Sequence, residues 1–297
     1  MTAAVISAVR ARGLGRGSRA RILAASWRHG RTRVGLALVV LVVLLALVGP
    51  LAAPHAPDAF VGIPSQSPSG RFPLGTDYLG HDVLSRVLWG GRSVVWMAFA
   101  AASLGVGLGA LAGMLAAYSR GGVDDVLMRG MDVVLAFPQI VFVLLFVSLL
   151  GPRLWLIVLM VALSWVPQVA RVARGITAEV IHREYVESAE LLGLPRRRIL
   201  VREILPNVTT PLGVEYGLRL TWSIALIAAV SFLGFGIQPP NADWGLMINE
   251  NRDILTVQPW AVIVPALCIA LFAVGVNLVT EGFARAVAGI DRGEREQ

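Results

Sequence analysis

Residues 34–51 read VGLALVVLVVLLALVGPL, an unbroken apolar run that decides the class of fold. A helix of about 20 apolar residues is long enough to cross the hydrocarbon core of a bilayer. Five further runs of comparable length follow along the chain, at 93–117, 133–150, 154–172, 212–236 and 260–280. The sequence therefore predicts an all-α integral membrane protein with six transmembrane helices.

The composition supports this class and excludes several others. Hydrophobic residues make up 56% of the 297 residues and charged residues only 15%, which is outside the range of soluble globular proteins. The single cysteine, Cys268, has no partner for a disulfide or a thiolate metal cluster. The chain contains no lysine, so it lacks the lysine of a Walker A motif. Any ATP hydrolysis must therefore come from another chain.

The distribution of arginine predicts the orientation. With the N-terminus in the cytoplasm, the segments 1–33, 118–132, 171–211 and 281–297 carry 20 arginines, against 5 in the opposite loops. Because cytoplasmic segments accumulate arginine, we expect an N-in, C-in topology. The net charge of +7 then requires no nucleic-acid partner, because the arginine excess faces the anionic lipid of the inner leaflet.

The first external loop, 52–92, is the longest segment on its side. Its first half is rich in Pro, Ser and Gly and is expected to be irregular. Asp82 and the apolar residues after it, among them Val83 and Val87, predict a short amphipathic helix lying at the membrane interface. We interpret this loop as a structural collar, with contact to a delivered substrate as the alternative.

A polar stretch, EYVESAELLGLPRRRILVREILPN at 184–207, lies between two apolar runs. Glutamates recur every three residues from Glu184, and Tyr185, Ala189 and Leu192 mark an apolar stripe, which predicts a short helix with an acidic side and a packing side. Gly193 is expected to end that helix in the left-handed conformation. A second helix is expected to follow and to stop at Pro206. Such an element either inserts into a groove on a soluble partner or is merely a solvated loop.

Polar residues inside the apolar runs are candidates for lining a path through the membrane, with helix-to-helix hydrogen bonds as the alternative. They are Gln139, Ser164, Gln168, Ser223, Ser231 and Asn277. Glu215 and Arg219 are four residues apart and are interpreted as an intrahelical pair, with gating as the alternative. Pro138 and Pro167 are expected to bend or to end their helices.

Several blocks resemble one family. Glu187, Ser188 and Ala189, followed by Gly193 and then Leu205 and Pro206, are similar to the EAA motif of bacterial ABC importer permeases. Across about 34–291, further blocks resemble the C-type permease of the dipeptide, oligopeptide and nickel subfamily. These blocks are PLGTDYLGHDVLSRVL at 73–88, DVVLAFPQI at 132–140, VSFLGFGIQPPNADWG at 230–245 and NLVTEGFARA at 277–286.

The resemblance implies a core permease domain at 93–286 in the bacterial inner membrane. It also implies a homologous second permease, two cytoplasmic ATPases that bind ATP and Mg²⁺, and an external binding protein. Residues 184–207 would form the coupling helix that contacts an ATPase. Its candidate contacts are Glu184, Glu187, Ser188, Ala189, Gly193, Arg196, Arg197, Arg198 and Pro206. Three positions depart from the family pattern: Ser188 replaces an alanine, His81 replaces a common arginine, and Glu203 is atypical.

Other functions are weaker. The four histidines lie outside the apolar runs, and no pair of aspartates lies at membrane depth, so no catalytic or metal site is expected. An ion-coupled secondary transporter is the alternative class on topology alone, and it would ordinarily show internal repeats and ionisable groups near the membrane midplane. The EAA-like segment argues against this class. Di- or oligopeptides are the expected cargo, with nickel chelates or haem as alternatives.

Overall fold

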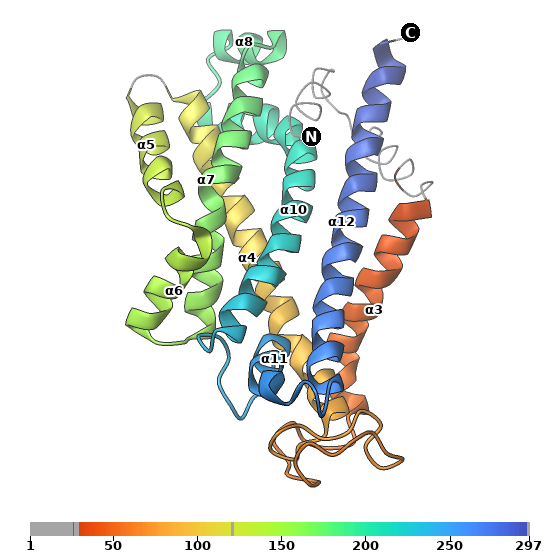
Figure 1. Ribbon diagram of the computed structural model, residues 1–297. Helices are drawn as coiled ribbons and strands as arrows, with labels where there is room; N and C mark the ends of the chain where they lie inside the picture. Colours follow the sequence, from red (N-terminus) through yellow and green to blue (C-terminus); the bar gives the residue numbers. More distant parts are fainter. Residues whose placement is uncertain (1–25, 27–29, 120–121, 296–297) are drawn as a thin grey trace.

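A computed structural model describes residues 26, 30–119 and 122–295, with side chains described up to residue 288. This part of the chain folds into a bundle of long helices (Figure 1). Five helical segments are long and apolar enough to cross a membrane. They are α3 (Gly30–Ala52), α4 (Val83–Tyr118), α7 (Leu154–Ile181), the run Arg196–Phe232, and α12 (Trp260–Arg295).

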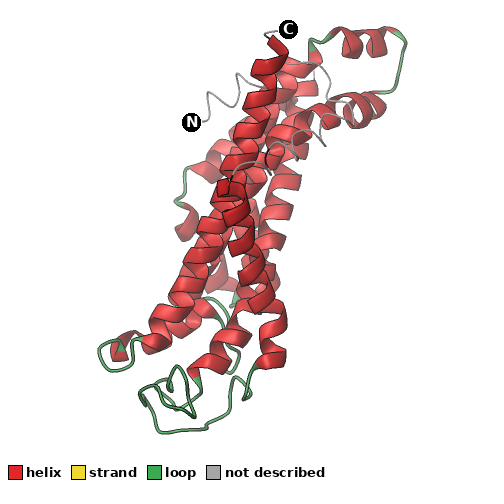
Figure 2. Ribbon diagram, turned by 90° about the vertical axis from the view of Figure 1, so that its right-hand side faces the viewer, coloured by secondary structure: helices red, strands yellow, loops and turns green. Residues whose placement is uncertain are grey.

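The bundle has two distinct ends. One end, which we name the α8 end, carries α8 (Glu184–Leu191) together with the start of α3 and the end of α12 (Figure 1). The other end carries the cap, defined as residues 53–82 between α3 and α4, and the short helix α11 (Trp244–Asn251). Figure 2 shows the same elongated bundle from the side, with loops gathered at both ends. The predicted N-terminal tail lies mostly outside the described residues.

The third predicted span, 133–150, is not one straight helix. It is divided into α5 (Val123–Leu135) and α6 (Gln139–Leu150), which meet at an angle of 83°. Pro138, which has no backbone N–H, lies at the break and is extended, with ψ 131°. Each helix is only about 20 Å long, so neither crosses a bilayer alone. Pro138 is thus confirmed as a bend point, whereas Pro167 lies within the continuous helix α7.

The separate amphipathic helix expected in the first loop is absent from the structure. Its residues are the first turns of α4, a single helix of 36 residues whose N-cap, Asp82, accepts a hydrogen bond from the backbone N–H of Ser85. Val83 and Val87 are buried in the core instead of facing the interface. The reason is tertiary: Trp244 of α11 packs on this turn and donates its indole N–H to the carbonyl of Val87 at 2.9 Å.

Close packing of α4 on α7 forms the centre of the bundle. Gly105, Gly109 and Gly113 recur every four residues on the face of α4 that meets α7. A Cβ atom added at Gly109 would lie 2.6 Å from the Cβ of Val169, and one added at Gly113 only 2.3 Å from a backbone oxygen of α7. Small residues at this spacing let membrane helices approach closely and gain van der Waals contact.

Candidate functional site

The helix α8 has one side in the bundle and one side in solvent. Val186 is fully buried and Ala189 is 6% exposed, and both pack in an apolar cluster with α4, α7 and the start of α10. Glu184, Glu187 and Ser188 are exposed. The predicted division into an acidic side and a packing side is therefore confirmed. Ala189, however, faces the bundle and is not available to a partner.

The expected apolar stripe of α8 is partly wrong. Tyr185 is 36% exposed and Leu192 is 79% exposed, whereas Val186 takes the buried position. Leu191 is 83% exposed beside Leu192, so the last turn of α8 presents two large apolar side chains to solvent.

Two features fix α8 to the bundle. Gly193 has φ 71°, as predicted, and its N–H bonds the carbonyl of Glu190 while the N–H of Leu194 bonds that of Ala189. These two bonds form a Schellman motif, which ends a helix with a defined turn. At the other side, the hydroxyl of Tyr118 donates to the carboxylate of Glu190 at 2.8 Å. The end of α4 is thereby tied directly to α8.

The segment after Gly193 does not form a second helix that ends at Pro206. Helix α9 (Arg196–Ile199) continues through the π-helical turn η1 (Leu200–Ile204) into α10 (Leu205–Phe232). Pro206 lies in the first turn of α10, where a missing N–H is tolerated. Arg196, Arg197 and Arg198 are exposed at the start of this run. The predicted fifth span therefore begins well before residue 212.

Helices α7 and α10 share a polar cluster. Arg219 donates through Nε and Nη2 to one oxygen of Glu215 at 3.1 and 2.8 Å, and through Nη1 to the side-chain oxygen of Gln168. Its guanidinium lies 5.1 Å from the centre of the Trp165 ring. Trp165 in turn donates its indole N–H to Ser223 at 3.0 Å. Four residues predicted from the sequence, Gln168, Ser223, Glu215 and Arg219, are thus brought together.

The other predicted path residues lie elsewhere. Ser164 is buried and donates to the carbonyl of Val161 in its own helix at 2.7 Å. Ser231 is buried at the cap end of α10, Gln139 is half-buried at the start of α6, and Asn277 is exposed on α12. These four residues do not belong to the α7–α10 cluster.

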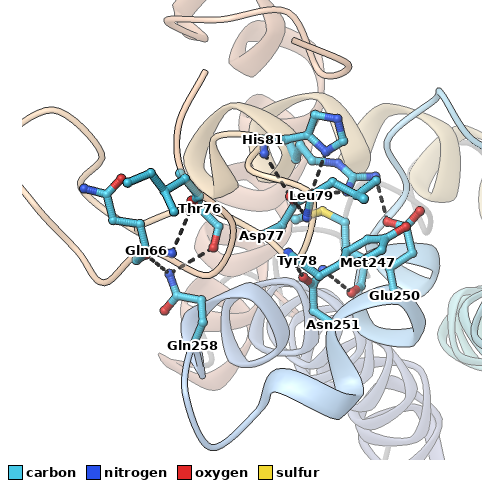
Figure 3. Close-up of polar contacts among 12 residues, drawn as sticks. Gln66, Thr76, Asp77, Tyr78, Leu79, His81, Met247, Glu250, Asn251 and Gln258 are labelled. Atoms are coloured by element: carbon cyan, nitrogen blue, oxygen red, sulfur yellow. Dashed lines mark hydrogen bonds and ion pairs between the residues drawn. The ribbon is translucent and has the colours of Figure 1, made fainter. Parts of the chain in front are cut away.

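The cap is held to α4 and α11 by a buried ionic network (Figure 3). The carboxylate of Asp77 is 2.6 Å from Nη1 of Arg86 and 2.9 Å from Nδ1 of His81. Nη2 of Arg86 also lies 2.8 Å from Glu250 of α11. In addition, the backbone N–H of Tyr78 donates to Asn251. This network supports the interpretation of the loop as a structural collar.

A second set of bonds in Figure 3 ties the cap to Gln258, which lies two residues before α12. The side-chain amide of Gln258, which is fully buried, donates to the carbonyls of Gln66 and Leu74 at 2.9 Å each. Gly75 must lack a side chain here, because a Cβ would lie 1.9 Å from the Gln258 amide nitrogen and its φ is 74°. The cap therefore folds against the bundle as a fixed body.

Burial sets the ionisation of the carboxyl groups at the cap end. Burial raises the pKa of Asp77, but the charge of Arg86 and the hydrogen bonds from His81 outweigh it, so the pKa lies below its ordinary value. Burial dominates for Glu250, whose pKa is raised despite the charge of Arg86. Asp243, the fully buried N-cap of α11, has a pKa raised by burial to about 6.

Sequence reasoning missed several of these residues. Trp165 stands three positions before Gln168, so a shared helix face was a signal for it. Arg86 lies within the block 73–88, but Glu250 and Gln258 are more than 160 positions away in the chain. No local pattern could pair them.

Comparison with known proteins indicates one family. Residues 105–289 match the family described as binding-protein-dependent transport system inner membrane component. A putative peptide transport system permease protein of Brucella abortus is 35% identical, with 86% of both chains covered. A di/tripeptide transport system permease protein of Pseudomonas aeruginosa is 34% identical, covering 88% of this chain and 89% of the relative.

A third relative is named for a different cargo. The glutathione transport system permease protein of Pectobacterium atrosepticum is 33% identical and covers 88% of this chain and 87% of the relative. In this family ATP is hydrolysed by separate subunits, so the chain has no ATPase site of its own and works with ATPase and substrate-binding partners. The chain belongs to the binding-protein-dependent inner membrane component family and is a multi-pass permease subunit of a bacterial ABC importer.

Proposed function

We propose that the chain crosses the inner membrane six times, with both termini in the cytoplasm. Counting α5 and α6 as one broken span gives the sixth crossing. An even number of crossings agrees with the start of α3 and the end of α12 lying at the same end as α8. The arginine excess of the segments at this end supports its cytoplasmic location, because cytoplasmic segments near spans are enriched in arginine.

The α8 end is the surface that couples this permease to an ATPase subunit. The observation that carries this proposal is the two-sided burial of α8: Glu184 and Glu187 are exposed, while Val186 and Ala189 are packed into the bundle. A helix fixed in this way transmits a push on its exposed side to α7 and η1, which it contacts, and through Tyr118 to α4. The exposed Leu191 and Leu192 would add apolar contact with the ATPase. Arg196–Arg198 would flank the groove of the ATPase into which α8 inserts.

The complete importer contains this chain, a homologous second permease, two ATPases that bind ATP and Mg²⁺, and an external binding protein. ATP binding closes the ATPases, moves the α8 ends and turns the pathway outward, and the binding protein then releases its cargo. Only a ligand that differs in affinity between the two states can shift such an equilibrium. ATP on the partner subunits is that ligand.

The cargo is a short peptide. Support comes from the relatives, which are named as permeases for peptides, di/tripeptides and glutathione, itself a tripeptide. The direct check is to purify the binding protein encoded with this permease and to identify its bound ligand by mass spectrometry. A nickel chelate or haem in place of a peptide would refute the assignment.

Docking of α8 is tested by co-purification of the ATPase subunits with the tagged permease in its full complex. Glu187→Arg reverses an exposed charge of α8 and is expected to reduce the amount of ATPase recovered. The control Asp253→Arg makes the same reversal at the opposite end, between α11 and α12. Equal ATPase recovery from the two variants, together with unchanged cargo-stimulated ATP hydrolysis, would disprove the role of α8.

A further inference from the structure

An ion pair lies deep within the membrane-spanning part of α10. Arg219 is thirteen residues from Phe232, the last residue of the helix. At about 1.5 Å per residue, it lies roughly 20 Å from the cap end, inside a hydrocarbon core of about 30 Å. The side chains of Arg219 and Glu215 are 13% and 7% exposed.

Packing does not require this pair. Buried ion pairs can often be replaced by apolar residues of similar volume without loss of stability, because the desolvation of the charges offsets their attraction. Helix α10 already places Ile224 and Ile227, both at most 1% exposed, in the main apolar core. Ionisable residues at membrane depth therefore usually mark a substrate or ion pathway.

The polar face that carries the pair extends onto α4. Tyr216 and Arg219 are three residues apart and share one face of α10. The hydroxyl of Tyr216 lies 3.2 Å from that of Ser103, which is an exposed residue of α4. An exposed serine and a guanidinium at this depth are unfavourable against lipid. This face consequently lines an aqueous space in the assembled transporter.

The guanidinium is oriented and can hold a further anion. Its contacts within the described chain engage Nε, Nη1 and Nη2 once each, out of the five N–H groups that arginine carries. Trp165 covers one face of the planar group. Gln168 and Trp165, both from α7, thus fix the plane of the fork, and a planar fork matches the geometry of a carboxylate.

We propose that Arg219 recognises the terminal carboxylate of the peptide cargo on its way through the membrane. When the path is empty, Glu215 holds the guanidinium with the same chemical group. Within the described chain, one N–H on each of Nη1 and Nη2 remains open to an incoming carboxylate beside Glu215. A terminal amide binds there more weakly, because hydrogen bonds between two charged groups are about twice as strong as neutral ones. This inference rests on the peptide-importer function proposed above.

The test measures a ratio of uptake rates in proteoliposomes that contain the complete transporter and saturating binding protein. Two labelled peptides of one sequence are compared, with a free C-terminal carboxylate and with a C-terminal amide. The affinity of the binding protein for each peptide is measured separately. Wild type is expected to take up the free acid faster. In Arg219→Gln this preference is expected to fall by about tenfold, the loss typical of a charge-assisted hydrogen bond.

Controls separate recognition from a structural role. Arg171→Gln removes an exposed arginine of α7 that pairs with Asp132, and it is expected to keep the wild-type ratio. Arg219→Lys keeps the charge and is expected to restore part of the preference. If Arg219→Gln slows both peptides by the same factor, Arg219 is structural and the inference fails. If wild type takes up neither peptide while another cargo is transported, the peptide function itself is refuted, and the inference with it.

Discussion

The close contact between α4 and α7 at Gly113 gives a quantitative prediction for Gly113→Ala. The added methyl carbon would lie 2.3 Å from the carbonyl oxygen of Ala170, 2.8 Å from the Cβ of Ala173 and 2.8 Å from a backbone nitrogen of α7. Ordinary contact begins at 3.4 Å. Because two of the three neighbours are backbone atoms that no rotamer change can move, α4 and α7 must separate by about 1 Å at this point.

The magnitude follows from comparison with a matched glycine. Gly107 lies on the same helix, and a Cβ added there meets nothing within 4 Å. Both substitutions gain the same helix propensity, about 1 kcal/mol, so that contribution cancels when the two variants are compared. Overpacking of a close interface typically costs about 1–3 kcal/mol. Gly113→Ala should therefore be less stable than Gly107→Ala by about 1–3 kcal/mol.

The assay is denaturant unfolding of the purified permease in detergent, followed by the fluorescence of its tryptophans. Gly107→Ala should unfold at or above the wild-type midpoint, and Gly113→Ala clearly below it. If the two variants unfold at the same midpoint, the α4–α7 contact is looser than its geometry indicates, and the argument from close packing is refuted.

Three further predictions concern other parts of the molecule. Arg86→Gln should lower the free energy of unfolding by about 3–5 kcal/mol, because it leaves the buried carboxylates of Asp77 and Glu250 uncompensated. Denaturant titration measures this change, and a loss below about 1 kcal/mol would contradict the prediction. Asp243 has a pKa raised from 3.8 to about 6, so its stabilising contribution is complete below about pH 4 and is lost as pH rises through about 6. Asp243→Asn should flatten the thermal stability profile between these pH values, and an unchanged slope would refute the assignment. Gly193→Ala should strain the turn after α8 by about 1–2 kcal/mol, since φ is 71°, and should lower the unfolding midpoint by a corresponding amount and weaken coupled ATP hydrolysis. Fluorescence and ATP hydrolysis measured on one preparation check this, and unchanged values of both would contradict it.

Local sequence signals located most of the fold. Apolar runs of spanning length identified every long helix, because the bilayer sets a minimum length that composition alone reveals. Gly193 and Pro138 were predicted correctly since each acts through its own backbone, by a left-handed φ and by a missing N–H. The division of α8 into a buried and an exposed side followed from helical periodicity.

Several contacts were missed because the partner lies far away in the sequence. Val83 and Val87 looked interfacial because Trp244, which covers them, lies about 160 positions further on. Pro206 looked like a helix end because nothing local indicates that η1 joins α9 to α10. The contact of the Trp165 ring with Arg219 and the hydrogen bond from the Gln258 amide to Gln66 likewise form only through tertiary packing.

The most direct test of the central claim is cross-linking from α8 in native membranes. Cys268, the single native cysteine, is buried in α12, so a cysteine introduced by Glu187→Cys is the accessible thiol. With a short thiol-to-amine cross-linker, we expect an adduct between this position and an ATPase subunit. We also expect an impermeant maleimide to label this cysteine only when the cytoplasmic face of the membrane is open to the reagent. Labelling from the external face, or no adduct with the ATPase in a transport-active complex, would contradict the account.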